Sequence, residues 1–298
     1  LGMLSISSVQ ATTYNNGQKT VITTNPYLVT DDVIENAGTV LQTNNVIVGN
    51  TGLGKLIIRN KGQVNSNNMI VGNKLGADGK LTVTGINSKL IAKELDIGYE
   101  GKGSAEIKDG GLVQASAMSI GNKEGSEGNL TVTGINSKLI VDDYLDAEET
   151  YLEIGYEGKG RATIANGGSV QTDVMSIGSE VGSEGELNVT GSNSKLNVTY
   201  FLEVGNAGKG SVTIADGASV TANATSAAGN SAMSLGRLAS GEGNLTVEGA
   251  NSALVTKELF VGNAGKGSAE IKDGGLVQAK SVSIGNKKGS EGELNVTG

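Results

Sequence analysis

Short runs of alternating apolar and polar residues recur along the chain at nearly constant spacing. In "SAEIKDGGLVQA" (104–115), Ala105 and Ile107 alternate with polar residues before the turn letters DGG. Alternation with a period of two is typical of a β-strand that buries one face and exposes the other. The runs end in Gly, Asn or Asp, which tolerate the left-handed backbone of a sharp corner. The pattern therefore predicts short strands joined by tight corners.

Two kinds of module alternate along the chain. Residues 101–115 and 265–279 carry the same fifteen letters, GKGSAEIKDGGLVQA, which belong to the first kind. First-type modules start at Val48, Ile97, Ile154, Val204 and Val261, and second-type modules start at Val71, Ile120, Ile177, Leu235 and Ile284. Most modules run 23 to 27 residues and contain three apolar runs. Three strands and three corners in this length predict one rung of a stacked coil.

The predicted fold is all-β: a right-handed, single-stranded parallel β-helix, or solenoid, with about 23–27 residues per rung. A β-propeller would need longer repeats with aromatic signatures. We assign 1–47 to an N-terminal cap and the first irregular rungs, and 48–298 to ten repeat rungs truncated at the C-terminal end. About two further rungs are expected before Val48. The expected inward residues are Ile97, Ile107, Ile120, Val132, Leu139, Ile154, Ile164 and Val204, and the expected outward ones are Lys102, Glu106, Lys108 and Thr131.

Composition narrows the interior and removes several kinds of chemistry. Aromatic residues make up 3% of the chain, so the interior must be a thin column of Ile, Val, Leu and Ala. The chain has no Cys and no His, which excludes a Cys–His zinc site, a thiol nucleophile and a Ser-His-Asp triad. We predict no catalytic residue, no metal site and no cofactor. The net charge of −8 argues against nucleic acid and anionic lipid as partners.

The motifs "VGN.G.G...I..GG.V" and "IG...GS.G.L.V.G..S.L" resemble the repeats of type V secretion passenger domains, the exported part of Gram-negative autotransporters. The resemblance covers 48–298 and is specific for a repeat type, not for an activity. It implies a right-handed β-helix, export through the outer membrane, and a C-terminal outer-membrane barrel in the same chain. The Lys- and Asn-rich style also resembles a proangiogenic group of Bartonella passengers. The absence of Cys fits such export, because a cross-linked chain would block a narrow pore.

The resemblance implies a secreted or surface-exposed virulence factor, monomeric, that binds a host-cell surface protein or glycan. Such a passenger acts either as an adhesin or as a soluble receptor agonist, for example a proangiogenic mitogen. A purely structural stalk or self-association module is the first alternative. A polysaccharide-active enzyme is disfavoured, because β-helical lyases and hydrolases need clustered Asp residues with a basic partner.

Candidate contact residues lie where the repetition is violated. Two modules are overlong by about eight residues, through Asp142–Tyr151 in one and Asn223–Ala232 in the other. The partner-binding candidates are Asp142, Asp143, Tyr144, Asp146, Glu148, Glu149 and Tyr151 in the first insertion, and Asn223, Thr225 and Asn230 in the second. Both insertions interrupt the same point of the rung, so we expect them on one edge, about 14 Å apart. A neutral solvated loop, or a metal site in the acidic first insertion, stays open as an alternative.

A recurring Asn marks one corner of the second-type modules. The positions are Asn87, Asn136, Asn193 and Asn251. We interpret them as turn residues, since Asn bonds to neighbouring backbone and tolerates left-handed dihedrals; a sugar-binding role is the alternative. The DGG and NGG motifs at Asp109, Asp273 and Asn166 receive the same interpretation.

Overall fold

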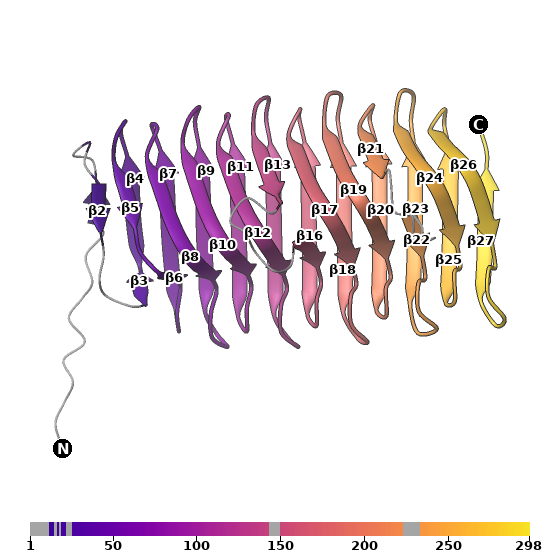
Figure 1. The fold of residues 1–298 in the computed structure, drawn as a ribbon, viewed down its shortest axis with the longest axis horizontal. Coiled ribbons are helices and arrows are strands. Elements are labelled where there is room, and N and C mark those ends of the chain that lie inside the picture. The colour runs from indigo at the N-terminus through magenta and orange to yellow at the C-terminus, as the bar shows by residue number, and fades with distance from the viewer. Residues whose placement is uncertain (1–11, 15–16, 18, 22–25, 143–149, 223–232) are drawn as a thin grey trace, which may run out of the picture.

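The computed structural model describes residues 12–14, 17, 19–21, 26–142, 150–222 and 233–298. Within these residues the strands pair in parallel and form a β-solenoid, whose rungs follow one another along a single axis (Figure 1). The predicted all-β parallel fold is therefore confirmed. None of the described residues forms a helix that is long and apolar enough to cross a membrane.

The strands form two sheets that run the length of the rod. The first sheet consists of β1 (Thr12–Tyr14), β4 (Asp31–Glu35), β7 (Leu53–Arg59), β9 (Asp78–Thr84), β11 (Lys102–Lys108), β13 (Glu127–Thr133), β16 (Lys159–Ala165), β18 (Glu184–Thr190), β20 (Lys209–Ala215), β23 (Glu242–Glu248), β25 (Lys266–Lys272) and β27 (Glu291–Val296). The second sheet consists of β2 (Lys19–Val21), β3 (Tyr27–Val29), β5 (Val40–Gln42), β6 (Asn45–Val48), β8 (Gln63–Val71), β10 (Lys89–Ile97), β12 (Leu112–Ile120), β14 (Lys138–Val141), β15 (Tyr151–Ile154), β17 (Ser169–Ile177), β19 (Lys195–Val204), β21 (Ser219–Ala222), β22 (Met233–Leu235), β24 (Ala253–Val261) and β26 (Leu276–Ile284).

Each rung contributes one strand to the first sheet, so the twelve strands of that sheet correspond to twelve described rungs. Only β1 and β4 precede Val48, which leaves ten rungs from that residue onward, as predicted. The first described strands pair with the next rung, β1 with β4, β2 with β5 and β3 with β6. Within the range assigned to the N-terminal cap and first irregular rungs, residues 1–11, 15, 16, 18 and 22–25 lie outside the described part of the chain, so the cap stays a prediction.

A rung has three faces, although two of them belong to one bent strand. In the pairing of β10 with β12 the register runs to Ala92 and resumes at Glu94, leaving Lys93 unpaired at a bend. Elsewhere the two halves are separate strands, as in β14 and β15 or β21 and β22. The three predicted strands per rung are thus three faces, and the middle corner is a bend that most rungs cross without a turn.

The core is a single apolar column enclosed by the three faces. Each of the eight residues expected to point inward is at most 1% exposed. The outward residues alternate with them along the strand, and Lys108 forms an ion pair with Glu106 at 2.6 Å. The predicted in/out phase of the strands is therefore confirmed.

One inward column of the first sheet consists of glycine. A Cβ built on Gly103 would lie 2.2 Å from the backbone N of Gly98 and 2.3 Å from the carbonyl O of Val71. Any side chain there would collide with backbone that cannot move aside. The corner can therefore pack this closely against the strand only where the strand carries glycine. The equivalent residues, paired strand by strand, are Gly54, Gly79, Gly128, Gly160, Gly185, Gly210, Gly243, Gly267 and Gly292.

The recurring Asn residues are corner residues, as expected. Asn87, Asn136, Asn193 and Asn251 all have φ between 67° and 70°, in the left-handed region. The Ser that follows each of them is fully buried. The hydroxyl of Ser137 accepts a hydrogen bond from the backbone N–H of Gly110 in the preceding first-type rung, at 3.0 Å. Ser194 and Ser252 do the same for Gly167 and Gly217. The two module types alternate because each corner of one type is satisfied by the other.

Charge alternates with the module type on the outer face of the first sheet. From β11 onward, first-type rungs place Lys and second-type rungs place Glu just before the glycine column, and the two side chains form ion pairs; the first two modules carry Leu53 and Asp78 there instead. Lys102 lies 2.9 Å from Glu127, and Lys159 lies 3.0 Å from Glu184. The pairs Lys209–Glu242 and Lys266–Glu291 follow at 3.7 and 3.3 Å. Exposed pairs contribute little individually, and their order favours one stacking register over a slip by one rung.

Replacing Ile107 by Asp should destabilise the fold by several kcal/mol, because an unpaired charge would enter a column without water. The matched change Lys108→Gln on the outer face should cost less than about 0.5 kcal/mol. Urea unfolding followed by circular dichroism measures both. Equal losses at the two positions would contradict the in/out phase.

Replacing Ser137 by Ala should cost about 1–3 kcal/mol, because it leaves the buried N–H of Gly110 without an acceptor. Ser104 is the control: its hydroxyl lies at 3.4 Å from the carbonyl O of Gly79 and is partly exposed, so Ser104→Ala should be nearly neutral. Thermal unfolding of the two variants checks the difference, and a silent Ser137→Ala would show that water satisfies the corner.

Candidate functional site

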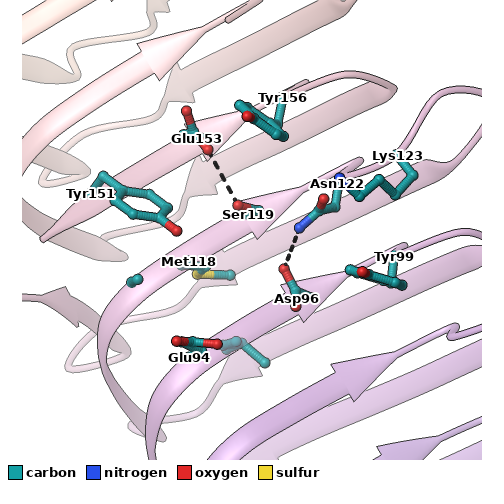
Figure 2. Close-up of a pocket in the computed structure, with 12 residues that line it drawn as sticks. Glu94, Asp96, Tyr99, Met118, Ser119, Asn122, Lys123, Tyr151, Glu153 and Tyr156 are labelled. Carbon is teal, nitrogen blue, oxygen red and sulfur yellow. Dashed lines mark hydrogen bonds between the residues drawn. The ribbon is translucent and has the colours of Figure 1, made fainter. Parts of the chain in front are cut away.

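A groove opens on the second half of the bent sheet, between β10 and β15 (Figure 2). Its volume is about 480 Å³. The lining residues are Glu94, Leu95, Asp96, Tyr99, Ala117, Met118, Ser119, Asn122, Lys123, Tyr151, Glu153 and Tyr156. They come from three consecutive rungs and from the corner that ends each of them.

The groove exists because the middle strand carries small outward side chains. On β12, Ala117 and Ser119 face outward, and they pair with Glu94 and Asp96 of β10 on one side. On the other side they pair with Tyr151 and Glu153 of β15. Two stacking steps separate the flanking strands, so the floor lies between walls about 10 Å apart. The result is a trough that follows β12.

Aromatic side chains stand at the corner end of the trough. After the positive-φ glycine of this corner most rungs carry Asn or Ser, whereas Tyr99 and Tyr156 occupy the position in the two rungs that flank β12. Between them, the ammonium group of Lys123 lies 5.8 Å from the ring centre of Tyr156 and 3.3 Å from Glu157. Figure 2 shows both tyrosines at this end and Tyr151 at the opposite, bend end.

Asp96 is a carboxyl group with a raised pKa of about 6. Burial is the main cause, because a charged carboxylate loses hydration in the sheet wall. The side-chain N–H of Asn122 donates to it at 2.6 Å and opposes the shift, as does the charge of Lys123. Repulsion from Glu94 adds to the rise.

Glu153, on the opposite wall, has a pKa raised to about 7, again mainly by burial. Hydrogen bonds from Ser179 and Ser119 lower the pKa, and the hydroxyl of Ser119 donates at 3.4 Å. The negative charges of Glu180 and Asp96 raise it. Near pH 7 this carboxyl therefore titrates while it faces the trough.

Glu203 supplies an internal comparison, since it occupies the same position of the repeat two rungs further on. Burial raises its pKa as well, but the cation of Arg237 opposes the rise. The two side chains form an ion pair at 2.8 Å. Among the described residues Glu153 has no such partner, so its carboxyl is the one left open to a ligand.

Of the predicted partner-binding residues, the structure describes Asp142 and Tyr151. Tyr151 forms part of the groove wall, and Asp142 lies at the end of β14, where one carboxylate oxygen is buried without a hydrogen-bond partner among the described residues. Asp143, Tyr144, Asp146, Glu148 and Glu149, and likewise Asn223, Thr225 and Asn230, lie outside the described residues, so their roles stay predictions.

The predicted position of the two insertions is confirmed by the strands on either side. Residues 143–149 follow β14 and precede β15, and 223–232 follow β21 and precede β22. Both breaks fall at the bend of the second sheet, with β17 and β19 between them, three rung steps apart. The groove residues Asp96, Tyr99, Glu153 and Tyr156 were missed by the sequence analysis. The sequence signal that could have located the groove is the Tyr at 99 and 156, because most rungs carry Asn or Ser after the corner glycine.

The described residues include no group of three or more acidic side chains arranged to hold a metal ion. The trough offers two carboxyl groups that accept hydrogen bonds, an amide, an ammonium group and three phenol rings. Such a set suits recognition of a ligand rich in hydroxyl groups, through charged acceptors and flat apolar faces.

Glu153→Gln should stabilise the protein in a pH-dependent way. The carboxyl has an ordinary pKa of 4.5 when unfolded and about 7 when folded, so the folded state alone holds the proton between these values. Wild-type stability from this group is therefore fully present below pH 4.5 and is lost as the pH rises through 7. Gln avoids that loss: we expect a melting temperature higher by a few degrees at pH 8 and unchanged at pH 4.

Glu203→Gln is the control, because it also removes the ion pair with Arg237. It should give no gain at pH 8. A gain for Glu153→Gln that is equal at pH 4 and pH 8 would contradict the raised pKa.

No protein-family model matches the chain. The uncharacterized lipoprotein YdeK of Escherichia coli strain K12 is 40% identical over 145 residues, which are 49% of this chain and 11% of YdeK. The chain thus spans only a small part of the length of this relative. The crystal structure of a TibA fragment, hyper-glycosylated by TibC, covers 97% of this chain and 100% of that fragment, with 14% identity and a TM-score of 0.36. A likeness of that extent carries no conclusion about fold or function.

Proposed function

We propose that this chain is a stretch of an exported, surface-exposed β-helical passenger that binds a protein or glycan on a host cell. The observation that carries the proposal is the groove between β10 and β15, where Tyr99 and Tyr156 replace the usual Asn or Ser of the corner and Tyr151 lines the opposite end. Tyrosines with one apolar face and one polar end are common anchors in binding interfaces. In a solenoid the repeats build the rod, and departures from the repeat provide specificity.

A location at the cell surface is supported by the relative YdeK, which is described as a lipoprotein. Lipoproteins are held at a membrane by covalently attached acyl chains. A stiff rod of parallel rungs is also suited to present a groove away from the surface that carries it. The resemblance of the repeats to type V passengers agrees with this location.

A structural stalk is the second candidate. It is favoured by the outer face of the first sheet, where Lys and Glu alternate from rung to rung between β11 and β20. In that case the groove residues would have no ligand. The two candidates make opposite predictions for variants that restore the regular corner residue.

The double variant Tyr99→Asn, Tyr156→Asn should lose most binding of the labelled protein to cultured epithelial or endothelial cells, measured by flow cytometry. Asn occupies this corner position in other rungs, including Asn122 between them, so the fold should be retained. Loss of two aromatic contacts should weaken binding about tenfold or more. Tyr200→Ser removes a tyrosine that does not line the groove and should bind as the parent does.

Deleting 143–149 and 223–232 together tests the predicted contribution of the insertions. We expect weaker cell binding with a nearly unchanged melting temperature, because surface insertions are thermodynamically cheap. Full binding by both the tyrosine variant and the deletion variant would leave the stalk as the function. If the soluble protein also triggers signalling, it acts as an agonist and not only as an adhesin.

A further inference from the structure

The charges of the trough restrict what it can bind. Glu94, Asp96 and Glu153 face it, and Lys123, the one cation among the described residues that line it, is paired with Glu157 at 3.3 Å. An anionic ligand would meet uncompensated carboxylates at neutral pH and above. A purely apolar ligand would displace water from these carboxyl groups without replacing its hydrogen bonds, which is costly. The remaining classes are cationic ligands and neutral ligands rich in hydrogen-bond donors. The ammonium group of Lys123 already lies in the trough beside Tyr156 and would repel a second cation there, so the neutral class fits the whole trough.

The dimensions favour one flat ring at a time. Asp96 and Glu153 lie in register on either side of Ser119, two stacking steps apart, about 10 Å between their strands. In Figure 2 the carboxylate of Glu153 is directed to Ser119 on the floor, and the carboxylate of Asp96 is directed to Asn122 at the corner end. A pyranose ring lying along β12 would place hydroxyl groups toward both walls, and the rings of Tyr151 and Tyr156 would border its two ends.

We propose that this groove binds a neutral carbohydrate, with Asp96 and Glu153 accepting hydrogen bonds from its hydroxyl groups and with Tyr151 and Tyr156 bordering its two ends. The inference deepens the proposed function, on which it rests, by naming the ligand class. Hydrogen bonds to ionised acceptors are about twice as strong as neutral ones. The two carboxyls therefore supply most of the selectivity, and Asn122 holds Asp96 in place at 2.6 Å.

Binding should depend on pH in a defined direction. Among the described residues, the charged or titratable groups around the two carboxyls are Glu94, Tyr99, Lys123, Tyr151, Tyr156 and Glu180. None of these adds a free cation that would keep Glu153 ionised at low pH. Because Asp96 and Glu153 ionise near pH 6 and 7, neutral sugars should bind more tightly at pH 8 than at pH 5.5.

The purified chain is titrated with lactose, maltotriose and chitotriose, and with 3′-sialyllactose as the anionic counterpart. Binding is measured by isothermal titration calorimetry and by NMR chemical-shift changes. We expect at least one neutral sugar to bind, more tightly at pH 8, and sialyllactose to bind at least about tenfold more weakly than lactose. Absence of binding by all three neutral sugars at both pH values would overturn the inference.

Two matched pairs of variants locate the site. Glu153→Gln should weaken sugar binding about tenfold, whereas Glu203→Gln, at the same repeat position but paired with Arg237, should leave it unchanged. Ser119→Gln fills the floor and should abolish binding, whereas Ser234→Gln, equally buried in another rung, should not. Equal losses within either pair would overturn the assignment, and hydrolysis of the sugar would overturn a binding role in favour of catalysis.

Failure of the sugar inference is distinguishable from failure of the proposed function. Cells treated with periodate, which destroys glycans, should lose binding of the parent protein if a carbohydrate is the ligand. If treated cells still bind the parent but not the Tyr99→Asn, Tyr156→Asn variant, the groove recognises a protein, and only the carbohydrate inference falls.

Discussion

The parallel hydrogen-bond ladder between consecutive rungs is the constraint on which the rest of the structure depends. Between the described end strands β1 and β27, every strand of the first sheet pairs with the strand one rung before and one rung after it. A residue added within a paired strand would shift every following side chain to the opposite face. Extra residues are therefore tolerated only where the ladder is interrupted. Both long insertions fall at one such place, the bend between the halves of the second sheet.

The ladder also explains why the module types alternate. Like residues at equal positions lie one rung apart, so repetition of one charged module would stack like charges. Alternation instead places Lys159 beside Glu184 and the hydroxyl of Ser137 beside the N–H of Gly110. The stable unit is thus a pair of unlike rungs, each completing the corners and the outer face of the other.

A groove can form in such a rod without any additional strand or loop. It is enough that the outward side chains at one repeat position are short in one rung and long in the rungs on either side. Ser119 lies between Asp96 and Glu153 in the outward column, and this short side chain between two longer ones forms the floor of the trough without any change to the core. The walls are then partly buried, and burial is what raises the pKa of both carboxyls. The backbone of both residues is fixed, because β10 and β15 each form a parallel ladder of backbone hydrogen bonds with the strand before and the strand after.

The sequence by itself determined the fold class, the number of rungs and the phase of the strands. These follow from local rules: a period of two sets which side chain is buried, and Gly or Asn permits each corner, as at Asn136 with its φ of 70°. It also located both insertions at one point of the rung. Only the tertiary structure decided that two of the three faces belong to one bent strand, and that Asp96, Ser119 and Glu153 lie side by side. The reason is register: residues 23 and 34 positions apart become neighbours only when the rungs are stacked, and their burial and raised pKa values arise from that stacking.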